Sequence, residues 1–213
     1  MLKNLTLLIG LCASISVFSQ INSGNPNIPF NSNNSYDFGL LPTNLPSSGA
    51  YGQSTEAANA WEEFKSGYIV NCGSDRARVK FDNQSETVSE GVAYSMLLAA
   101  YAADQDVFNR LWAYYKINRN SNGVMNWKVN GCSNNALGQN GATDAELDAA
   151  MALIVADKQW GSSGQVHDYS GDAISLIKKI KQHEVNNNTF NNGDGWGHAN
   201  GCRNPSYLSL IHI

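Results

Sequence analysis

The sequence contains few charged residues and no run of basic ones. Asp, Glu, Lys and Arg make up 15% of its 213 residues, against about a quarter in ordinary soluble domains. The formal net charge is -4, and the 14 Lys and Arg residues are dispersed. Nucleic acids and anionic membranes attract clustered positive charge, so the composition speaks against both as partners. Asn, Ser and Gly take the place of charges, which suits a surface that hydrogen-bonds to neutral partners.

No apolar run of membrane-spanning length is evident either. The run from Leu5 to Val17 is too short to cross a bilayer comfortably. Lys3 precedes it, and small residues follow at the -3 and -1 positions before Gln20, as in a secretory signal. We therefore expect a signal peptide at residues 1–19 and a secreted or periplasmic protein, an uncleaved anchor being the alternative.

Cysteine is also scarce. Three cysteines remain once the predicted signal is removed: Cys72, Cys132 and Cys202. An odd number permits at most one disulfide within the chain and leaves one thiol over, and the sequence does not select the pair. Export would favour such a bond. Neither these cysteines nor His167, His183 and His198 share the spacing of a metal site, so we predict no metal and no cofactor.

Helical periodicity dominates after an Asn-, Ser-, Pro- and Gly-rich lead-in at residues 20–53. Apolar residues recur at helical spacing in five segments: 55–69, 88–103, 106–116, 143–160 and 168–183. The stretches between them are rich in Asn and Gly and show no strand series. We predict one all-α domain over residues 54–207, with functional loops gathered at one end.

The apolar stripes of these helices indicate the expected core. Near the start of the domain the stripe is Ala58, Trp61, Phe64 and Tyr68. In segment 143–160 it is Leu147, Ala150, Met151, Ile154 and Val155. In segment 168–183 it is Ile174, Ile177 and Ile180. We also expect three tryptophans in the core, namely Trp61, Trp112 and Trp160.

Acidic residues stand at the start of two apolar helices. Thr87-Val88-Ser89-Glu90 and Thr143-Asp144-Ala145-Glu146 both fit a capping box, and Asp144 also fits a first-turn acid favoured by the helix dipole. A helix start that faces a cleft can instead hold a carboxyl group rigidly for catalysis. Glycoside cleavage uses two carboxyls in unlike surroundings, one protonated and one charged. Spacing alone does not decide between capping and catalysis.

Longer motifs around these acids resemble glycoside hydrolase family 8. Residues 142–160 are similar to the second signature of that family, with Glu146 where the family usually has Asp and Ala149 where it has Ile or Met. Residues 89–96, S-E-G-V-A-Y-S-M, resemble its proton-donor segment. Further similar motifs follow in the family's order: G-L-L-P at 39–42, N-G-V-M-N-W-K at 122–128, D-K-Q-W-G at 157–161 and N-P-S-Y at 204–207.

The resemblance implies an (α/α)6 barrel and an inverting mechanism. Glu90 would protonate the leaving oxygen, and Asp144 would contact the sugar at the bond being cut, although another assignment of the signature makes Asp144 the nucleophile. The general base would lie beyond residues 204–207, at the wider separation that an inverting pair needs. We therefore expect an N-terminal part of such a barrel, without its C-terminal helices and with a truncated or aberrant end at 208–213. Alone, it should be inactive and poorly stable.

Aromatic side chains supply the predicted sugar contacts, because sugar rings stack their C–H faces on aromatic rings. Trp127 resembles the family's stacking tryptophan, Tyr94 lies one helical turn after Glu90, and Trp196 and Tyr207 stand in later loops. We predict Trp127, Tyr94 and Tyr207 as substrate-binding residues, core packing being the alternative for each.

These features favour a monomeric, secreted endo-β-1,4-glucanase acting on a β-1,4-linked polysaccharide. Xylanase and chitosanase are alternatives within the family, and the Asn-rich loops speak against a chitosanase, which would need extra acids for its cationic substrate. An alternative of another class is a non-catalytic glycan-binding protein in which Glu90 and Asp144 act only as caps.

Overall fold

A computed structural model describes residues 53–162, 166–196 and 204–208 of the chain. Over these residues it contains five α-helices: α1 Gln53–Tyr68, α2 Ser89–Tyr101, α3 Gln105–Ile117, α4 Thr143–Trp160 and α5 Tyr169–His183. Each matches a helix predicted from the sequence to within a few residues. The predicted signal peptide, the lead-in up to residue 52, Cys202 and His198 lie outside the described residues.

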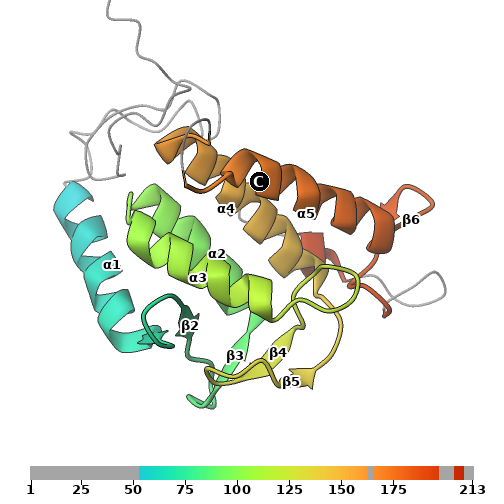
Figure 1. Ribbon diagram of the computed structural model, residues 1–213, viewed down its shortest axis with the longest axis horizontal. Coiled ribbons are helices and arrows are strands. Elements are labelled where there is room, and N and C mark those ends of the chain that lie inside the picture. Colours follow the sequence, from blue (N-terminus) through green and yellow to red (C-terminus); the bar gives the residue numbers. More distant parts are fainter. Residues whose placement is uncertain (1–52, 163–165, 197–203, 209–213) are drawn as a thin grey trace, which may run out of the picture.

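Four helices, α2 to α5, pack together as a layer, and α1 lies at one edge of the molecule (Figure 1). α2 contacts α3 on one side and α4 on the other, and α4 in turn contacts α5. α2 and α4 both begin at the end of the layer where β3, β4 and β5 lie (Figure 1). This arrangement brings the starts of the two helices that carry Glu90 and Asp144 to the same end of the molecule.

Short strands occupy the segments that the sequence indicated as loops, so the prediction of a purely α-helical fold was wrong in this respect. The strands are β1 Ile69–Asn71, β2 Ala77–Val79, β3 Glu86–Val88, β4 Lys128–Asn130, β5 Ala136–Gly138, β6 Val185–Asn186 and β7 Thr189–Phe190. They pair antiparallel as β1-β2, β3-β4-β5 and β6-β7. Strands of two or three residues are too short to show an alternating apolar pattern.

Neither predicted capping box forms. α2 starts after Val88 and α4 after Ala142, and neither N-cap residue makes a side-chain capping bond. The hydroxyl of Thr87 instead donates to the carbonyl of Val79 at 2.7 Å. Side-chain caps are found on α3, where Asp104 accepts from the N–H of Val107, and on α5, where Asp168 accepts from that of Gly171. Capping therefore does not explain the acids at the starts of α2 and α4.

α4 is buried on more than one side because it lies between α2 and α5. Of its predicted stripe, Ala150 and Val155 are buried, whereas Leu147, Met151 and Ile154 are only partly buried. Its fully buried apolar positions are mainly small: Ala145, Ala149, Ala152, Leu153 and Ala156. Small side chains let the helices approach closely. At the far end the side chain of Gln159 donates to the carbonyl of Ala100 at 2.9 Å, joining α4 to α2.

The three tryptophans predicted for the core, Trp61, Trp112 and Trp160, are buried as expected. The predicted stripe of α5 was wrong in two of three positions, because Ile174 is 51% and Ile177 44% exposed. α5 packs against α4 through another stripe, which comprises Tyr169, Ala173, Leu176 and Ile180. The two stripes overlap at Ile180, and apolar spacing alone does not tell which of them faces the neighbouring helix.

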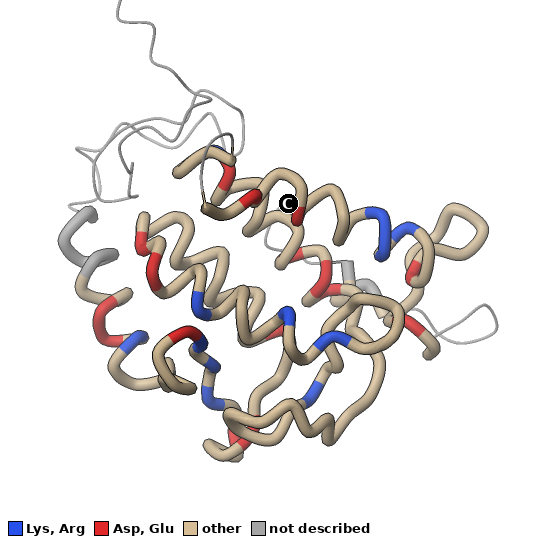
Figure 2. The backbone as a smooth tube through the Cα atoms, viewed as in Figure 1, with Lys and Arg blue, Asp and Glu red and all other residues tan. Residues whose placement is uncertain are grey.

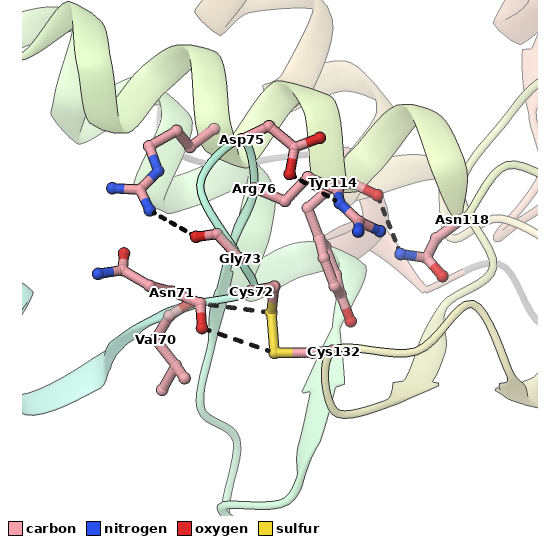
Figure 3. Close-up of polar contacts among 10 residues, drawn as sticks. Val70, Asn71, Cys72, Gly73, Asp75, Arg76, Tyr114, Asn118 and Cys132 are labelled. Carbon is pink, nitrogen blue, oxygen red and sulfur yellow. Dashed lines mark hydrogen bonds and ion pairs between the residues drawn. A yellow bond between two sulfur atoms is a disulfide. The ribbon is translucent and has the colours of Figure 1, made fainter.

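A disulfide between Cys72 and Cys132 joins the segment after β1 to the loop after β4, across a sequence separation of 60. The side chain of Tyr114 lies beside it in Figure 3, and its hydroxyl donates to the carbonyl of Gly131 at 2.5 Å. The side chain of Arg110 reaches the other segment and donates to the carbonyl of Gly73. The disulfide and these two side chains of α3 hold both loops in place.

Three buried carboxyl groups lie under the start of α4, from Glu146, Glu184 and Asp194. Asp194 accepts hydrogen bonds from the side chains of Asn120 and Asn122, each at 2.8 Å, and from the N–H of Gly141. Glu146 accepts from the N–H of Met125 at 3.2 Å. These bonds tie the loop after α3 and the segment after β7 to the residues that precede Asp144.

Burial and repulsion by neighbouring carboxylates raise the pKa values of two of these acids, Glu146 and Glu184. Burial raises the pKa of Glu184 to about 8, helped by the negative charge of Asp194. Burial and the charge of Glu184 raise the pKa of Glu146 well above its ordinary value. A buried carboxyl group with no full set of partners is far less costly neutral than charged.

We expect loss of the disulfide to lower the free energy of unfolding by about 2–4 kcal/mol, because it closes a long loop. The paired substitution Cys72→Ser with Cys132→Ser should show this in urea unfolding under non-reducing conditions. Cys202→Ser removes a thiol but not this bond and serves as the control. Equal stability of the double variant and the parent would contradict the prediction.

We also expect Glu184→Gln to change the pH dependence of stability. The folded-state pKa is raised, so the contribution of Glu184 is fully present below its unfolded pKa and is lost as pH rises through about 8. The free energy of unfolding of the parent, minus that of Glu184→Gln, should fall by a few kcal/mol between about pH 4.5 and 8, since one pKa unit corresponds to about 1.4 kcal/mol. Urea unfolding at pH 5 and 8 measures this. The exposed Glu63→Gln is the control, and a difference independent of pH would refute the prediction.

Candidate active site

Four of the five predicted site residues lie on the wall of one hollow of about 480 Å³, a size suited to a small ligand. The predicted residues that line it are Glu90, Trp127, Asp144 and Tyr207. The remaining lining residues are Phe81, Val88, Ser89, Gln139, Ala142 and Trp196. Tyr94, the fifth predicted residue, is not among them, but its side chain is hydrogen-bonded to Glu90. The structure therefore brings both predicted catalytic acids to one concave surface.

The backbone of Trp127 joins the starts of the two acid-bearing helices. Its carbonyl accepts a hydrogen bond at 3.0 Å from the N–H of Ser89, the first residue of α2. Its own N–H donates at 2.8 Å to the carbonyl of Asn140, which lies just before α4. The separation of Glu90 and Asp144 is thus set by the backbone of a single residue of the intervening loop as well as by the packing of α2 on α4.

Trp127 is 40% exposed and lines the hollow. It lies directly against Gly138, where even a Cβ atom would collide with the indole. The ammonium group of Lys128 lies 6.0 Å from the centre of the Trp127 ring and 5.9 Å from that of Phe81, and it pairs with Glu86 at 2.6 Å. The glycine and the cation fix a flat aromatic surface that faces the hollow.

A second aromatic pair enters from the far end of the described chain. The carbonyl of Asn192 accepts from the N–H of Thr143 at 3.1 Å, which places the segment after β7 beside the start of α4. Gly193 leaves room for the ring of Trp196, which packs edge-to-face on Tyr207 with ring centres 5.3 Å apart. Trp196 was one of several aromatics that the sequence left undecided between core and site, and it lines the hollow.

Glu90 and Asp144 occupy unlike surroundings. Glu90 is exposed on the wall of the hollow, whereas Asp144 is only 8% exposed. The pKa of Asp144 is raised to about 6, mainly by burial, with a smaller contribution from the negative charges of Glu90 and Asp148, while a hydrogen bond from the N–H of Ala145 opposes the shift. The site therefore combines an accessible carboxyl group with a buried one that changes charge near neutral pH.

Two phenol groups adjoin these acids and stay protonated. Burial and then the hydrogen bond to Glu90 raise the pKa of Tyr94. Burial, together with the charges of Asp144 and Glu90, raises the pKa of Tyr207. A neutral phenol is a hydrogen-bond donor, so Tyr94 can orient the carboxyl group of Glu90 from behind the wall of the hollow.

Sequence reasoning missed Phe81 and Gln139 as lining residues. Phe81 lies in a polar, irregular stretch and is 39% exposed. An exposed aromatic residue flanked by polar ones was the signal that could have indicated a binding surface. Gln139 stands in an Asn- and Gly-rich loop and carried no signal of its own. Within the described ranges, no group of three or more His, Cys, Asp or Glu side chains could hold a metal ion, and no helix there is long and apolar enough to cross a membrane.

Charged residues are sparse over the described chain, with Lys and Arg interspersed among Asp and Glu (Figure 2). The hollow itself combines two acids with four aromatic rings and a glutamine. Such a surface can bind a neutral, hydroxyl-rich molecule and transfer a proton to or from it.

Comparisons with known proteins identify the family to which the chain belongs. The family model described as "Glycosyl hydrolases family 8" matches residues 42–211. Endoglucanase 2 of Ruminiclostridium josui is 34% identical over 98% of this chain and 46% of its own length. Beta-glucanase of Niallia circulans is also 34% identical, over 88% of this chain and 48% of its own length.

A solved structure of a beta-1,3-1,4-glucanase from Paenibacillus sp. X4 superposes with a TM-score of 0.67 at 34% identity, covering 80% of this chain and 47% of that one. The chain thus spans about half the length of the relatives it matches. Since the family model covers most of its residues, including both acids of the hollow, the chain belongs to glycosyl hydrolase family 8.

Proposed function

We propose that this chain carries the proton donor and the sugar-binding wall of an inverting glycosidase that cuts internal β-1,4 links of a glucan. The observation that carries the proposal is that Glu90 and Asp144 line one hollow together with Trp127, Trp196 and Tyr207. Aromatic faces bind the apolar faces of sugar rings, and a pair of unlike carboxyls is what hydrolysis of a glycosidic bond needs.

Glu90 is the general acid in this proposal. It lies at the wall of the hollow, where its carboxyl group is accessible to a bound sugar chain. The hydrogen bond with Tyr94 restrains the carboxyl group from one side. In the reaction Glu90 protonates the glycosidic oxygen as the bond to the anomeric carbon breaks, and the leaving sugar departs with that proton.

Asp144 stabilises the sugar ring at the bond being cut. With a pKa of about 6, it is mostly ionised at neutral pH, and its negative charge favours the positive charge that develops on the ring in the transition state. Its location at the start of α4 is held by the hydrogen-bonded network of Glu146 and Asp194. A rigid position is what an electrostatic stabiliser needs.

The general base belongs to the part of the protein that completes the site. The relatives that this chain matches are about twice as long, and an inverting reaction needs a second carboxylate on the far side of the sugar, with room for a water molecule. In this proposal the five described helices are one part of an (α/α)6 barrel, and the remaining helices supply the base.

The names of the relatives favour a glucan as substrate. Endoglucanases and beta-glucanases lead the matches, whereas the cold-adapted family 8 xylanase shares only 22% identity and supports the fold alone. The proposed place of action is outside the cytoplasm, supported by the disulfide between Cys72 and Cys132, since such bonds persist in oxidising compartments.

Glu90→Gln tests the proposal in the complete protein. The amide cannot donate an acidic proton, so we expect kcat on soluble β-1,4-glucan to fall by about 10²–10⁴-fold while substrate affinity changes little. Reducing-end release measures the rate, and the exposed Glu63→Gln is the matched control. Equal turnover of Glu90→Gln and the control would contradict the assignment of Glu90 as the general acid. Substrate binding with no turnover in the parent would indicate a non-catalytic glycan-binding protein instead.

Trp127→Ala tests the sugar-binding wall. Removing the exposed ring takes away a stacking surface, and we expect the affinity for cello-oligosaccharides to fall by about tenfold, which corresponds to about 1.4 kcal/mol. Titration calorimetry in the Glu90→Gln background measures this without hydrolysis. Trp127→Phe keeps a ring and should retain most of the affinity. Leu137→Ala, at an exposed apolar residue that does not line the hollow, should bind normally, and the same loss there would contradict the prediction.

A further inference from the structure

A second hollow of about 450 Å³ adjoins the first. Six residues line it: Gly67, Tyr68, Lys80, Phe81, Asp82 and Gln84. Phe81 lines both hollows, so the two concave surfaces adjoin at this residue. None of the other five residues takes part in the site described above.

Tyr68 provides an aromatic face in the second hollow. It is the last residue of α1 and is 53% exposed. Its ring stacks on Phe64 with centres 5.3 Å apart, and Phe64 in turn stacks on the buried Trp61. The stack anchors the ring to the core while leaving it accessible, which makes it a rigid platform at little entropic cost.

The other wall of the second hollow is fixed by hydrogen bonds. The N–H of Lys80 donates to the carbonyl of Tyr68 at 2.9 Å, and its ammonium donates to the carbonyl of Gly67 at 2.8 Å. The turn between β2 and β3 closes with a bond from the N–H of Phe81 to the carbonyl of Glu86. The side chains of Asp82 and Gln84 are exposed along this wall and are available to sugar hydroxyl groups.

The aromatic rings form a track that leads from one hollow to the other. The ammonium of Lys128 lies within 6.0 Å of the ring centres of both Phe81 and Trp127. Tyr68 follows Phe81 in the second hollow. Exposed aromatics along two adjoining hollows, with amide and carboxyl groups beside them, fit an extended neutral chain of sugars better than a compact ligand.

We propose that the second hollow is an additional sugar-binding subsite, which holds a β-1,4-linked glucan chain beyond the units held in the catalytic hollow. The inference rests on the proposed function, because it assigns the same substrate to a continuation of the same surface. It makes Tyr68 a specificity-determining residue that favours long substrates over short ones.

Tyr68→Ala tests this inference in the complete protein with Glu90→Gln, so that oligosaccharides stay intact. We expect the affinity for cellohexaose to fall by about tenfold, with cellotriose binding unchanged, because only the longer chain reaches Tyr68. Tyr68→Phe retains the ring and should bind both as the parent does. Ile174→Ala, at a residue of α5 with nearly the same exposure, controls for loss of an exposed apolar side chain. Thermal unfolding checks that the Tyr68 variants remain folded.

Four outcomes separate the subsite from the proposed function. A selective loss for cellohexaose that Tyr68→Phe restores supports the subsite. Equal affinities of Tyr68→Ala and Tyr68→Phe for cellohexaose would overturn it and leave the proposed function in place, as would an equal loss for both oligosaccharides. If the parent with Glu90→Gln binds neither oligosaccharide, the proposed function fails, and the subsite fails with it.

Discussion

The site depends on the contact between α2 and α4, which holds two carboxyl groups from distant parts of the sequence at one end of the molecule. Small buried residues such as Ala93 and Ala149 allow the helices to approach closely. At one end the peptide of Trp127 joins the helix starts, and at the other Gln159 bonds to Ala100. A shift of α4 along α2 would break both sets of bonds, so the relative position of Glu90 and Asp144 is strongly constrained.

Buried carboxyl groups reinforce the fixed position of the two helices. They would destabilise the fold if they were charged. Glu146 and Glu184 are fully buried near Asp194, and their raised pKa values follow from that burial. Asp194 takes three hydrogen bonds from two neighbouring segments. Burying these carboxyl groups costs the fold stability. In return, the network fixes the positions of the loops that carry Trp127 and Trp196. Glu146 stands where the resemblance expected Asp, and the longer side chain reaches the backbone of Met125.

The sequence predicted the helices and most of the residues of the site. It did not predict the short strands and turns that connect them. Long apolar repeats predicted all five described helices, and the motifs around Glu90 and Asp144 identified residues that share one hollow. The short strands escaped because two or three residues carry no periodicity. The inward face of α5 was misjudged because its two apolar stripes overlap at Ile180. Phe81 was overlooked because its neighbours are polar and its role depends on a turn that closes through Glu86.

The short strands that the sequence did not predict position the aromatic side chains of the hollow. β3 and β4 pair so that Val88 lies opposite Lys128, which places Trp127 directly beside the start of α2. β5 then brings Gly138 under the indole, and the absence of a side chain there lets the ring lie flat. Gly193 serves Trp196 in the same way. Helix packing therefore sets where the acids lie, whereas short strands and two glycines set the orientation of the aromatic faces in the hollow. A substitution in the second group would alter the aromatic wall while leaving the acids in place.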